Sequence, residues 1–305
     1  MERQYILHMF TPGKQMSPFD INMAVDAGYQ VVVPYCGVTA GEIRGLTQDA
    51  IFSRGPKGVK ATGIFIGGRD VLLAADMLET ARQAMVPPFQ VSVMADPSGS
   101  YTTAAALVAC VEQQLKRVHG TDLADKRVLI LGGSGTVGRI AGVLAAGLGA
   151  RVTLGHHRDG AIAEEAARAT GARFECQLQG TDASSPAARR AALAEADVLL
   201  ATAAAGVQVV SAEERAGATQ LLVAADVNAV PPEGIAAVGV MDDGKALPEG
   251  RAVGIGALAV GNVKYQVEHR LLAAMRGGDK PVYLGFREAF AMAREVVAEK
   301  AAAQS

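Results

Sequence analysis

Tryptophan is absent from this 305-residue chain, and aromatic residues make up only 5% of it. Stacking platforms for nucleic-acid bases are therefore not expected. Neither sign of charge dominates, because 29 Lys and Arg residues face 31 Asp and Glu residues, a formal net charge of −2. This balance excludes a general positive field toward nucleic acid or acidic lipid, so any bound anion must be held by a local site.

Cysteine and long hydrophobic runs are also scarce. Cys36, Cys110 and Cys176 are far apart and form no CxxC motif or Cys/His pair, so we predict free thiols in a reducing compartment and no metal site. The first apolar run is too short for a signal peptide. Glycines interrupt the most apolar stretches, 141–150 and 252–263, well short of a membrane span. We therefore expect a cytoplasmic protein without a membrane partner.

Half of the residues are hydrophobic and 20% are charged, a composition typical of a compact globular protein. Short apolar runs alternate with longer helical patterns, which predicts parallel sheets with helices on both faces. The expected strands are residues 5–10, 30–34, 62–67, 90–95, 127–131, 151–154, 197–201 and 221–225. The expected helices include residues 71–85, 161–169, 102–119, 257–275 and 286–300.

The length of the chain allows two domains, each with its own core. The helix expected at 102–119 follows a glycine- and serine-rich turn and is the natural bridge between them. A C-terminal helix that returns to the first domain gives a second crossover. We therefore predict an α/β protein with a substrate domain at 1–104, completed by 267–305, a Rossmann-type domain at 105–266, and a cleft between them.

A dinucleotide-binding motif carries the clearest chemistry. An apolar strand ends in G-x-G-x-x-G, formed by Gly133, Gly135 and Gly138, and a helix begins at once. The first glycine is expected to permit the tight turn, the second to let the backbone approach a pyrophosphate, and the third to let helix and strand pack closely. The helix N-terminus supplies free amides and a positive dipole end. The predicted phosphate-binding residues are Gly133, Ser134, Gly135, Thr136, Val137 and Gly138.

The end of the next strand discriminates between cofactors. An NAD enzyme usually places an acidic residue there to bind the ribose hydroxyls, but this segment runs through two histidines to Arg158 before Asp159. Arg158, helped by His157 or His156, is predicted to bind a 2′-phosphate. NADP is favoured and NAD is kept as a second acceptor, while an exposed basic turn is the alternative interpretation.

Four separated segments resemble one known family. They are SPFD at 17–20, DPSGSYTTAA at 96–105, DVNAVPP at 226–232 and GIGALAVGNVK at 254–264. In this order they resemble the NAD(P)-dependent methylenetetrahydromethanopterin dehydrogenases of aerobic one-carbon-using bacteria, over nearly the whole chain. The resemblance implies a pterin substrate for the first domain. The implied reaction is hydride transfer from the methylene group to NADP or NAD, giving the methenyl form, in formaldehyde oxidation and one-carbon metabolism.

The matching segments also suggest site residues. Asp20 and Lys264 are the expected catalytic residues, although Asp20 in the first turn of a helix and Lys264 reaching to solvent are the plain structural alternatives. The residues expected to bind the pterin are Asp96, Ser100, Thr102 and Thr103, and N-capping is the alternative for the last three. Further contacts to the cofactor are expected from Ala203, Asp226 and Asn228.

Three other functions remain open at this stage. One is the same reaction on methylenetetrahydrofolate, which no spacing in the sequence excludes. Another is a general NADPH-dependent reductase, which needs a tyrosine with a lysine four residues on, whereas Tyr265 directly follows Lys264. The third is a dinucleotide sensor that binds NADPH without turnover. No nucleic-acid partner is expected, and a homo-oligomer is.

Overall fold

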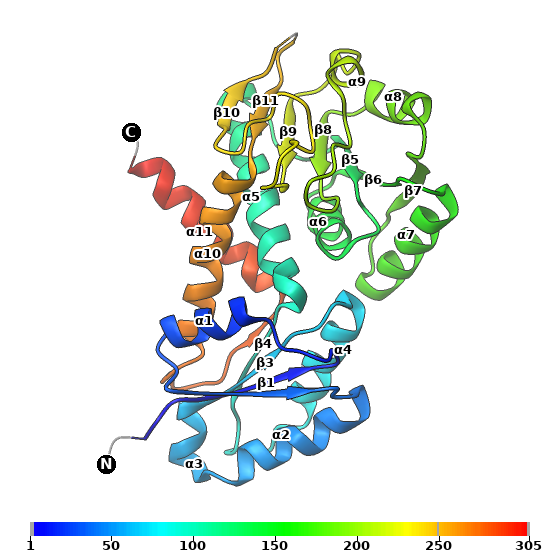
Figure 1. The fold of residues 1–305 in the computed structure, drawn as a ribbon. Helices are drawn as coiled ribbons and strands as arrows, with labels where there is room; N and C mark the ends of the chain where they lie inside the picture. The colour runs from blue at the N-terminus through cyan, green and yellow to red at the C-terminus, as the bar shows by residue number, and fades with distance from the viewer. Residues whose placement is uncertain (1–2, 249, 304–305) are drawn as a thin grey trace. The chain divides into compact units, whose positions relative to one another are not determined.

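The computed structural model of the protein describes residues 3–248 and 250–303. The chain divides into two compact units (Figure 1): the first is Met1–Thr102 with Tyr265–Met292, and the second is Thr103–Lys264 with Ala293–Ser305. Three helices contribute to both units, namely α5 (Ser100–His119), α10 (Ala257–Ala274) and α11 (Phe286–Ala302).

The first unit contains a five-stranded parallel sheet in the order β12-β4-β3-β1-β2. Its strands are β1 (Ile6–Thr11), β2 (Val31–Cys36), β3 (Thr62–Ile66), β4 (Ser92–Ala95) and β12 (Tyr283–Leu284). From β1 the chain moves outward to β2 and then returns past β1 to β3. The strand order therefore reverses between β1 and β3, the kind of position at which ligands gather in α/β sheets.

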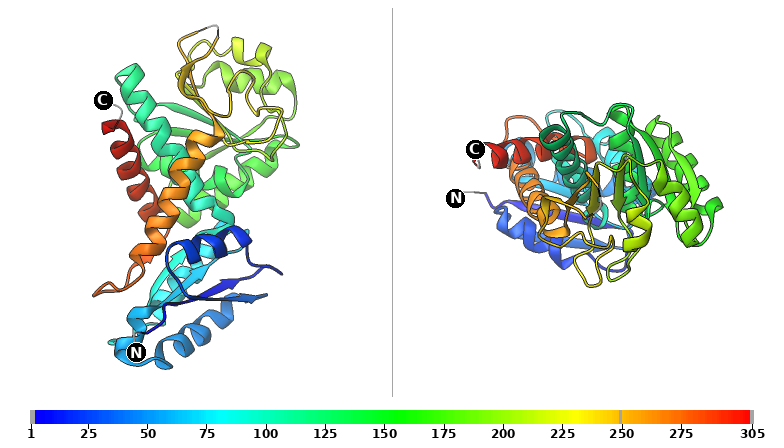
Figure 2. Two further views of the ribbon diagram at one scale, coloured as in Figure 1. Left: turned by 60° about the vertical axis from the view of Figure 1, so that its left-hand side comes forward. Right: turned by 90° about the horizontal axis from the view of Figure 1, so that it is seen from above.

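Helices cover both faces of this sheet (Figure 2). The structure shows α1 (Pro18–Asp26), α2 (Ile43–Phe52), α4 (Val71–Gln83) and the single-turn α3 (Gly55–Gly58) in this unit. Short 3₁₀ turns lie at Ala40–Glu42, Val59–Ala61 and Pro97–Gly99. The end of α10 packs beside α1, since His269 contacts the carbonyl of Asp26 at 3.3 Å. Right-handed crossovers place α2 and α4 on the opposite face.

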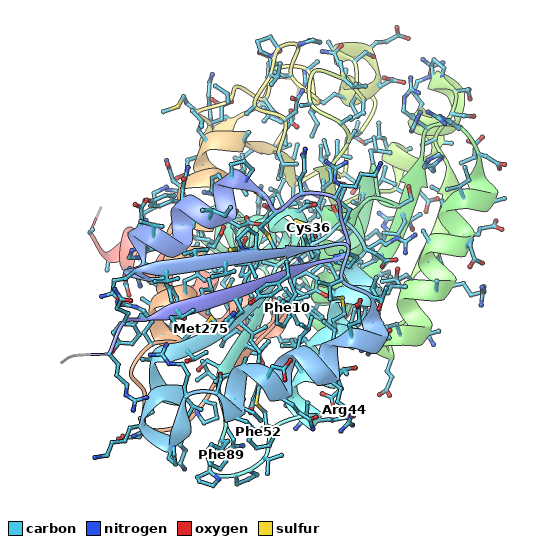
Figure 3. All side chains as sticks on the ribbon, turned by 60° about the horizontal axis from the view of Figure 1, so that its bottom comes forward. Phe10, Cys36, Arg44, Phe52, Phe89 and Met275 are labelled. Carbon is cyan, nitrogen blue, oxygen red and sulfur yellow. The ribbon has the colours of Figure 1, made fainter. Side chains whose placement is uncertain are left out.

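The alternation of side chains along β1 explains how this strand is covered. Leu7 and Met9 point to one face and are fully buried. Phe10, labelled in Figure 3, points to the other face and packs edge to face against Tyr35 of β2, with ring centroids 5.3 Å apart. Farther along the unit, Phe52 and Phe89 form a second aromatic pair at 5.6 Å.

The second unit contains a seven-stranded sheet in the order β10-β11-β9-β8-β5-β6-β7. Its strands are β5 (Arg127–Leu131), β6 (Arg151–His156), β7 (Gln179–Asp182), β8 (Val198–Ala201), β9 (Val223–Asp226), β10 (Asp243–Ala246) and β11 (Val253–Ile255). All described pairs are parallel except β10 with β11. The six parallel strands have the Rossmann order, which confirms the predicted fold class.

Helices flank this second sheet as well. They are α6 (Thr136–Gly147), α7 (Gly160–Phe174), α8 (Pro186–Ala194) and the short α9 (Ala212–Ala216). α6 and α7 follow β5 and β6 and cover one face, and the chain then crosses through α8 to the other face. On that face, Leu193 of α8 packs with Leu129, Leu199 and Leu221 in one buried cluster.

The structure differs from the sequence-based expectation in its strands. The eight predicted strands are all present, but β7, β10, β11 and β12 were not predicted. The units divide after residues 102 and 264, and Ala293–Ser305 groups with the second unit. Ion pairs explain this grouping: Arg294 binds both carboxylate oxygens of Glu112 at 2.8 Å, and Lys300 binds Asp243 at 2.8 Å.

Cys110 and Cys176 are buried and half-buried, and Cys36 is exposed at the end of β2; all three are free thiols. Over 3–248 and 250–303, no helix combines the length and the apolar character needed to cross a membrane. The same ranges hold no group of three or more His, Cys, Asp or Glu side chains arranged to bind a metal ion.

Candidate functional site

The glycine-rich turn after β5 has the geometry that dinucleotide binding requires. Gly132 takes a positive φ of 81°, a conformation that L side chains rarely adopt. A Cβ atom there would lie 2.6 Å from the backbone nitrogen of Ala203. The tight turn is therefore formed by Gly132, one residue before the Gly133 to which the motif had assigned it.

The other glycines of the motif permit close packing. A Cβ on Gly133 would lie 2.8 Å from Leu154 of β6, and one on Gly138 would lie 2.7 Å from the Cα of Gly133. Gly135 is the N-cap of α6, and its N–H donates to the carbonyl of Gly132 at 3.0 Å. The backbone N–H groups of Ser134, Thr136 and Val137 thus lie in the turn at the positive end of the α6 dipole.

The loop after β8 lies beside this turn. Thr202 donates its backbone N–H and its hydroxyl to the carbonyl of Leu131, at 2.8 and 3.2 Å. This pairing holds Ala203 against Gly132, so the structure brings two predicted cofactor segments together. They flank the point between β5 and β8 where the strand order reverses, which is where dinucleotides bind in this class of fold.

Asp226, at the end of β9, organises the next loop of the same edge. Its carboxylate accepts N–H groups from Asn228 at 2.9 Å, Gly234 at 2.6 Å and Ile235 at 3.2 Å. Burial raises the pKa of this carboxyl above its ordinary value, although these three hydrogen bonds act in the opposite direction. The side chain is 2% exposed and therefore shapes the loop from within.

Asn228 connects this loop with the loop after β8. Its Oδ1 accepts N–H groups from Gly206 at 2.9 Å and Val230 at 3.0 Å, and its Nδ2 donates to the carbonyl of Pro232 at 2.7 Å. The polar atoms of the amide are thereby engaged within the chain. Contact of Asp226 or Asn228 with the cofactor stays a prediction, and the observed bonds show that both residues position the backbone of the loops after β8 and β9.

Two histidines and an arginine lie at the end of β6. The Nε of Arg158 is 3.2 Å from His157 Nε2, and the Arg158 backbone N–H donates to His156 Nδ1 at 3.2 Å. Burial and the neighbouring His157 and Arg158 lower the pKa of His156 below its ordinary value. Asp159 does not pair with Arg158 in the described structure, because it caps α7 by accepting the N–H of Ala161. The strand therefore ends in donors and positive charge.

In the first unit, the predicted pterin residues Asp96, Ser100 and Thr102 surround the start of α5. Asp96 is fully buried, and its carboxylate accepts the N–H of Tyr101 at 2.8 Å and the hydroxyl of Thr102 at 2.6 Å. Ser100 donates its hydroxyl to the carbonyl of Pro97 at 2.6 Å. Ser100 and Thr102 are also fully buried, so they act on the shape of the turn.

The exposed residue of this turn is Ser98, which the sequence did not single out. Its backbone has φ 54° and ψ 32°, an unusual conformation for a residue with a side chain. Its hydroxyl donates to the carbonyl of Gly68 in the loop after β3, at 2.7 Å. Left-handed backbone outside glycine concentrates at functional sites, and this observation alone could have added Ser98 to the candidates.

Asp20, Thr103 and Lys264 lie on helices. Asp20 is in the first turn of α1, is 3% exposed, and donates its backbone N–H to the N-cap Ser17 at 3.4 Å. Thr103 is half-buried in α5, and Lys264 is half-buried about two turns into α10. Glu268 follows Lys264 by four residues on the same helical face and is fully buried, a carboxyl that the sequence analysis missed.

The residues present fit a bound NAD(P). The Gly132 turn leaves no room for a side chain, and the α6 N-terminus provides amides for a pyrophosphate. The end of β6 provides an arginine and histidine N–H donors for a 2′-phosphate. One further residue supports the turn, since Arg139 Nε donates to the Ser134 carbonyl at 3.0 Å.

Comparison with known proteins gives the family. Residues 18–98 match the family model described as the N-terminal part of methylene-tetrahydromethanopterin dehydrogenase. A Methylorubrum extorquens protein named NAD(P)-dependent methylenetetrahydromethanopterin dehydrogenase is 48% identical over 291 residues, which is 95% of this chain and 98% of that protein. A second protein of the same organism, named Bifunctional protein MdtA, is 30% identical over 292 residues, again 95% of this chain and 98% of the relative.

Solved structures show the fold at lower identity. Shikimate 5-dehydrogenase from Listeria monocytogenes, solved with shikimate and NAD, has a TM-score of 0.51 at 13% identity, over 89% of this chain and 92% of that one. Ornithine carbamoyltransferase from Pyrococcus furiosus has a TM-score of 0.50 at 15% identity, over 91% and 86%. The near-complete match at 48% identity confirms the resemblance of the four segments, and the chain belongs to the NAD(P)-dependent methylenetetrahydromethanopterin dehydrogenase family.

Proposed function

We propose that this protein oxidises methylenetetrahydromethanopterin to the methenyl form and transfers the hydride to NADP, with NAD as a second acceptor. The 48% identity to a dehydrogenase of that name across 95% of the chain carries the proposal. The Rossmann strand order and the Gly132 turn support it independently, because they provide the dinucleotide site that the reaction needs.

The chemistry requires orientation more than proton transfer. The C–H bond of the methylene carbon breaks, and its electron pair leaves with the hydrogen for the nicotinamide C4. Lone pairs of the two flanking nitrogens stabilise the resulting methenyl cation, so no strong base is needed. The protein must hold the methylene carbon close to the acceptor carbon and stabilise the developing positive charge through carboxylates and oriented dipoles.

We assign the cofactor-binding roles to the carboxyl edge of the second sheet. The turn from Gly133 to Gly138 is expected to bind the pyrophosphate through backbone N–H groups. Arg158 and His157 are expected to bind the 2′-phosphate of NADP by charge-assisted hydrogen bonds. Ala203 is expected to contact the cofactor through its backbone, while Asp226 and Asn228 hold the adjoining loops in place.

We assign the pterin roles to the remaining predicted residues. Asp20 is expected to face the developing cation, and Lys264 to orient the substrate or tune charge near the reacting carbon. Asp96, Ser100 and Thr102 are expected to fix the start of α5, since all three are fully buried. Thr103, which is half-buried, is expected to hydrogen-bond the pterin.

We also propose that the enzyme works in the cytoplasm as a homo-oligomer, with no nucleic-acid or membrane partner. Three free thiols, one of them exposed, suit a reducing compartment. Light scattering coupled to size-exclusion chromatography tests the assembly, and a monomer mass at micromolar concentration would contradict it.

Steady-state assays with purified protein test the function. Reduction of NADP is followed by absorbance with methylenetetrahydromethanopterin, and the assay is repeated with methylenetetrahydrofolate and with NAD. We expect the highest kcat/KM with the methanopterin and NADP. Failure to reduce either nicotinamide with either carrier would overturn the proposal, and preference for the folate would reassign the carrier.

An arginine variant tests the cofactor assignment. Arg158→Ala is expected to raise the KM for NADP about tenfold or more and to leave that for NAD nearly unchanged. Arg168→Ala is the matched control, because it removes an exposed arginine from α7 that pairs only with Glu165 among described groups. Equal losses with the two cofactors in Arg158→Ala would sink the 2′-phosphate assignment.

A further inference from the structure

The contacts of Arg158 indicate which ring nitrogen accepts in each of the two histidines at the end of β6. Arginine has five N–H donors and no acceptor. The 3.2 Å contact between Arg158 Nε and His157 Nε2 therefore requires His157 Nε2 to accept. The backbone N–H of Arg158 likewise requires His156 Nδ1 to accept, also at 3.2 Å. In this arrangement each ring accepts at one nitrogen, so the ring donor is the N–H at the other nitrogen.

The remaining donors of this cluster have no acceptor in the described part of the chain. They are His156 Nε2–H, His157 Nδ1–H and the two terminal amino groups of Arg158. The rings of the two histidines lie together, with centroids 4.7 Å apart and planes tilted by 37°. Three side chains therefore gather several directed N–H groups and one positive charge at a single strand end.

The carboxylates that could neutralise the cluster are engaged elsewhere. Asp159 accepts the N–H of Ala161, and Asp182, which pairs in register with His156 on β7, accepts the N–H of Ser184 at 2.8 Å. In this cluster His156 is half-buried, while His157 and Arg158 are exposed. A cluster with donors, one positive charge and no acceptor among the described groups is complementary to an oxyanion with several acceptor oxygens.

We propose that His156 is a specificity-determining residue of the cofactor site: its neutral imidazole donates Nε2–H to the 2′-phosphate of NADP, beside Arg158 and His157. This inference rests on the proposed NAD(P)-dependent function and adds a third phosphate donor to it. His156 acts by a hydrogen bond and not by a positive charge, so its contribution does not need a proton from solution.

The charges around His156 agree with a neutral ring. Burial, His157 and Arg158 lower its pKa, and only Asp159 opposes them among the groups that shift it. Asp182 on β7 bears the remaining nearby carboxylate. Arg189 of α8 lies close by, donating to the Ala183 carbonyl at 3.2 Å, and is paired with Glu214.

Two amide variants separate the proposed role from a structural one. His156→Gln places an N–H donor where Nε2–H now lies but loses the acceptor for the Arg158 backbone. His156→Asn keeps an acceptor at the Nδ1 position but has no group that reaches the Nε2 position. We measure the dissociation constants of NADP and NAD by calorimetry, without pterin, so that the result does not depend on turnover.

We expect His156→Asn to weaken NADP about tenfold while NAD binding stays within about twofold, and His156→Gln to retain most of the NADP preference. The opposite pattern, with Asn retaining and Gln losing the preference, would assign His156 to loop structure and overturn the proposal. Loss of both cofactors in both variants, or of neither, would overturn it as well.

A pH series provides a second readout. The proposal assigns the selectivity to ring N–H groups and an arginine and not to an imidazolium. The ratio of NADP to NAD affinity in the unmodified protein is therefore expected to stay level between about pH 7 and about pH 9. A ratio that falls about tenfold per pH unit in that range would show that an imidazolium carries the selectivity. Selective NADP binding without pterin turnover would leave this inference standing while the proposed reaction fails.

Discussion

Replacing Asp226 by asparagine removes one acceptor from a buried carboxylate that needs both oxygens. Oδ1 accepts the N–H of Asn228, while Oδ2 accepts those of Gly234 and Ile235. An amide has a single oxygen, so in either orientation its NH₂ group faces at least one backbone N–H. Each buried donor left without an acceptor costs about 1–3 kcal/mol. The orientation in which the amide oxygen accepts from Gly234 and Ile235 leaves one donor, the Asn228 N–H, without an acceptor and is therefore the cheaper one. Relief of the buried charge offsets part of this cost, and we expect a net loss of about 1–2 kcal/mol.

The measurement is urea unfolding together with hydrogen exchange. We expect the free energy of unfolding to fall by that amount at an unchanged m value, and the amide of Asn228 to exchange faster. Asp242→Asn is the control, because Asp242 accepts one backbone N–H, from Gly239 at 2.8 Å, which an amide oxygen can still accept. Equal stability of Asp226→Asn and the unmodified protein would refute the reasoning.

Three further substitutions test other parts of the account. Gly132→Ala is expected to lower the free energy of unfolding by about 2–5 kcal/mol, because of left-handed backbone strain and the clash with Ala203. It should also weaken the binding of NADP and NAD alike in calorimetry, and unchanged binding would refute the role of this turn. Lys264→Ala is expected to lower kcat by at least about tenfold with NADP affinity nearly unchanged, and unmodified rates would remove Lys264 from the mechanism. Burial acts to raise the pKa of Glu214, but hydrogen bonds at the α9 cap and the charge of Arg189 lower it more. The ionised Glu214 carboxylate therefore stabilises the folded state above the ordinary glutamate pKa, and this stabilisation is lost as the pH falls through the lowered pKa of Glu214. The melting-temperature deficit of Glu214→Gln should shrink in acid, and a constant deficit would contradict this.

The strands that could be predicted from the sequence are those with apolar runs. Ile6–Thr11 and Arg127–Leu131 lie inside their sheets, and burial on both faces leaves continuous hydrophobic stretches in the sequence. Gln179–Asp182 and Asp243–Ala246 are polar edge strands and have no such pattern. They form because a neighbouring strand offers hydrogen-bonding partners, which is a tertiary effect that local sequence does not record.

The candidate site shows the same division. The G-x-G-x-x-G spacing located the glycine-rich turn but assigned the tight turn to Gly133, and only the backbone shows that Gly132 has the positive φ. The family resemblance also suggested Ser100 and Thr102, without showing that both are fully buried. Ser98 was missed because serine carries no sequence signal for a left-handed conformation. Residue type thus predicted the chemistry of the site better than the exposure of each side chain.

Direct hydride transfer between carrier and cofactor is the central claim, and an isotope experiment tests it. The methylene carbon is labelled with deuterium, the protein is supplied with NADP in ordinary water, and the product nicotinamide is analysed by mass spectrometry. Our account predicts a single deuterium at C4 of the reduced nicotinamide and the remaining one on the methenyl product. Deuterium released to water, or reduced nicotinamide without label, would contradict the account.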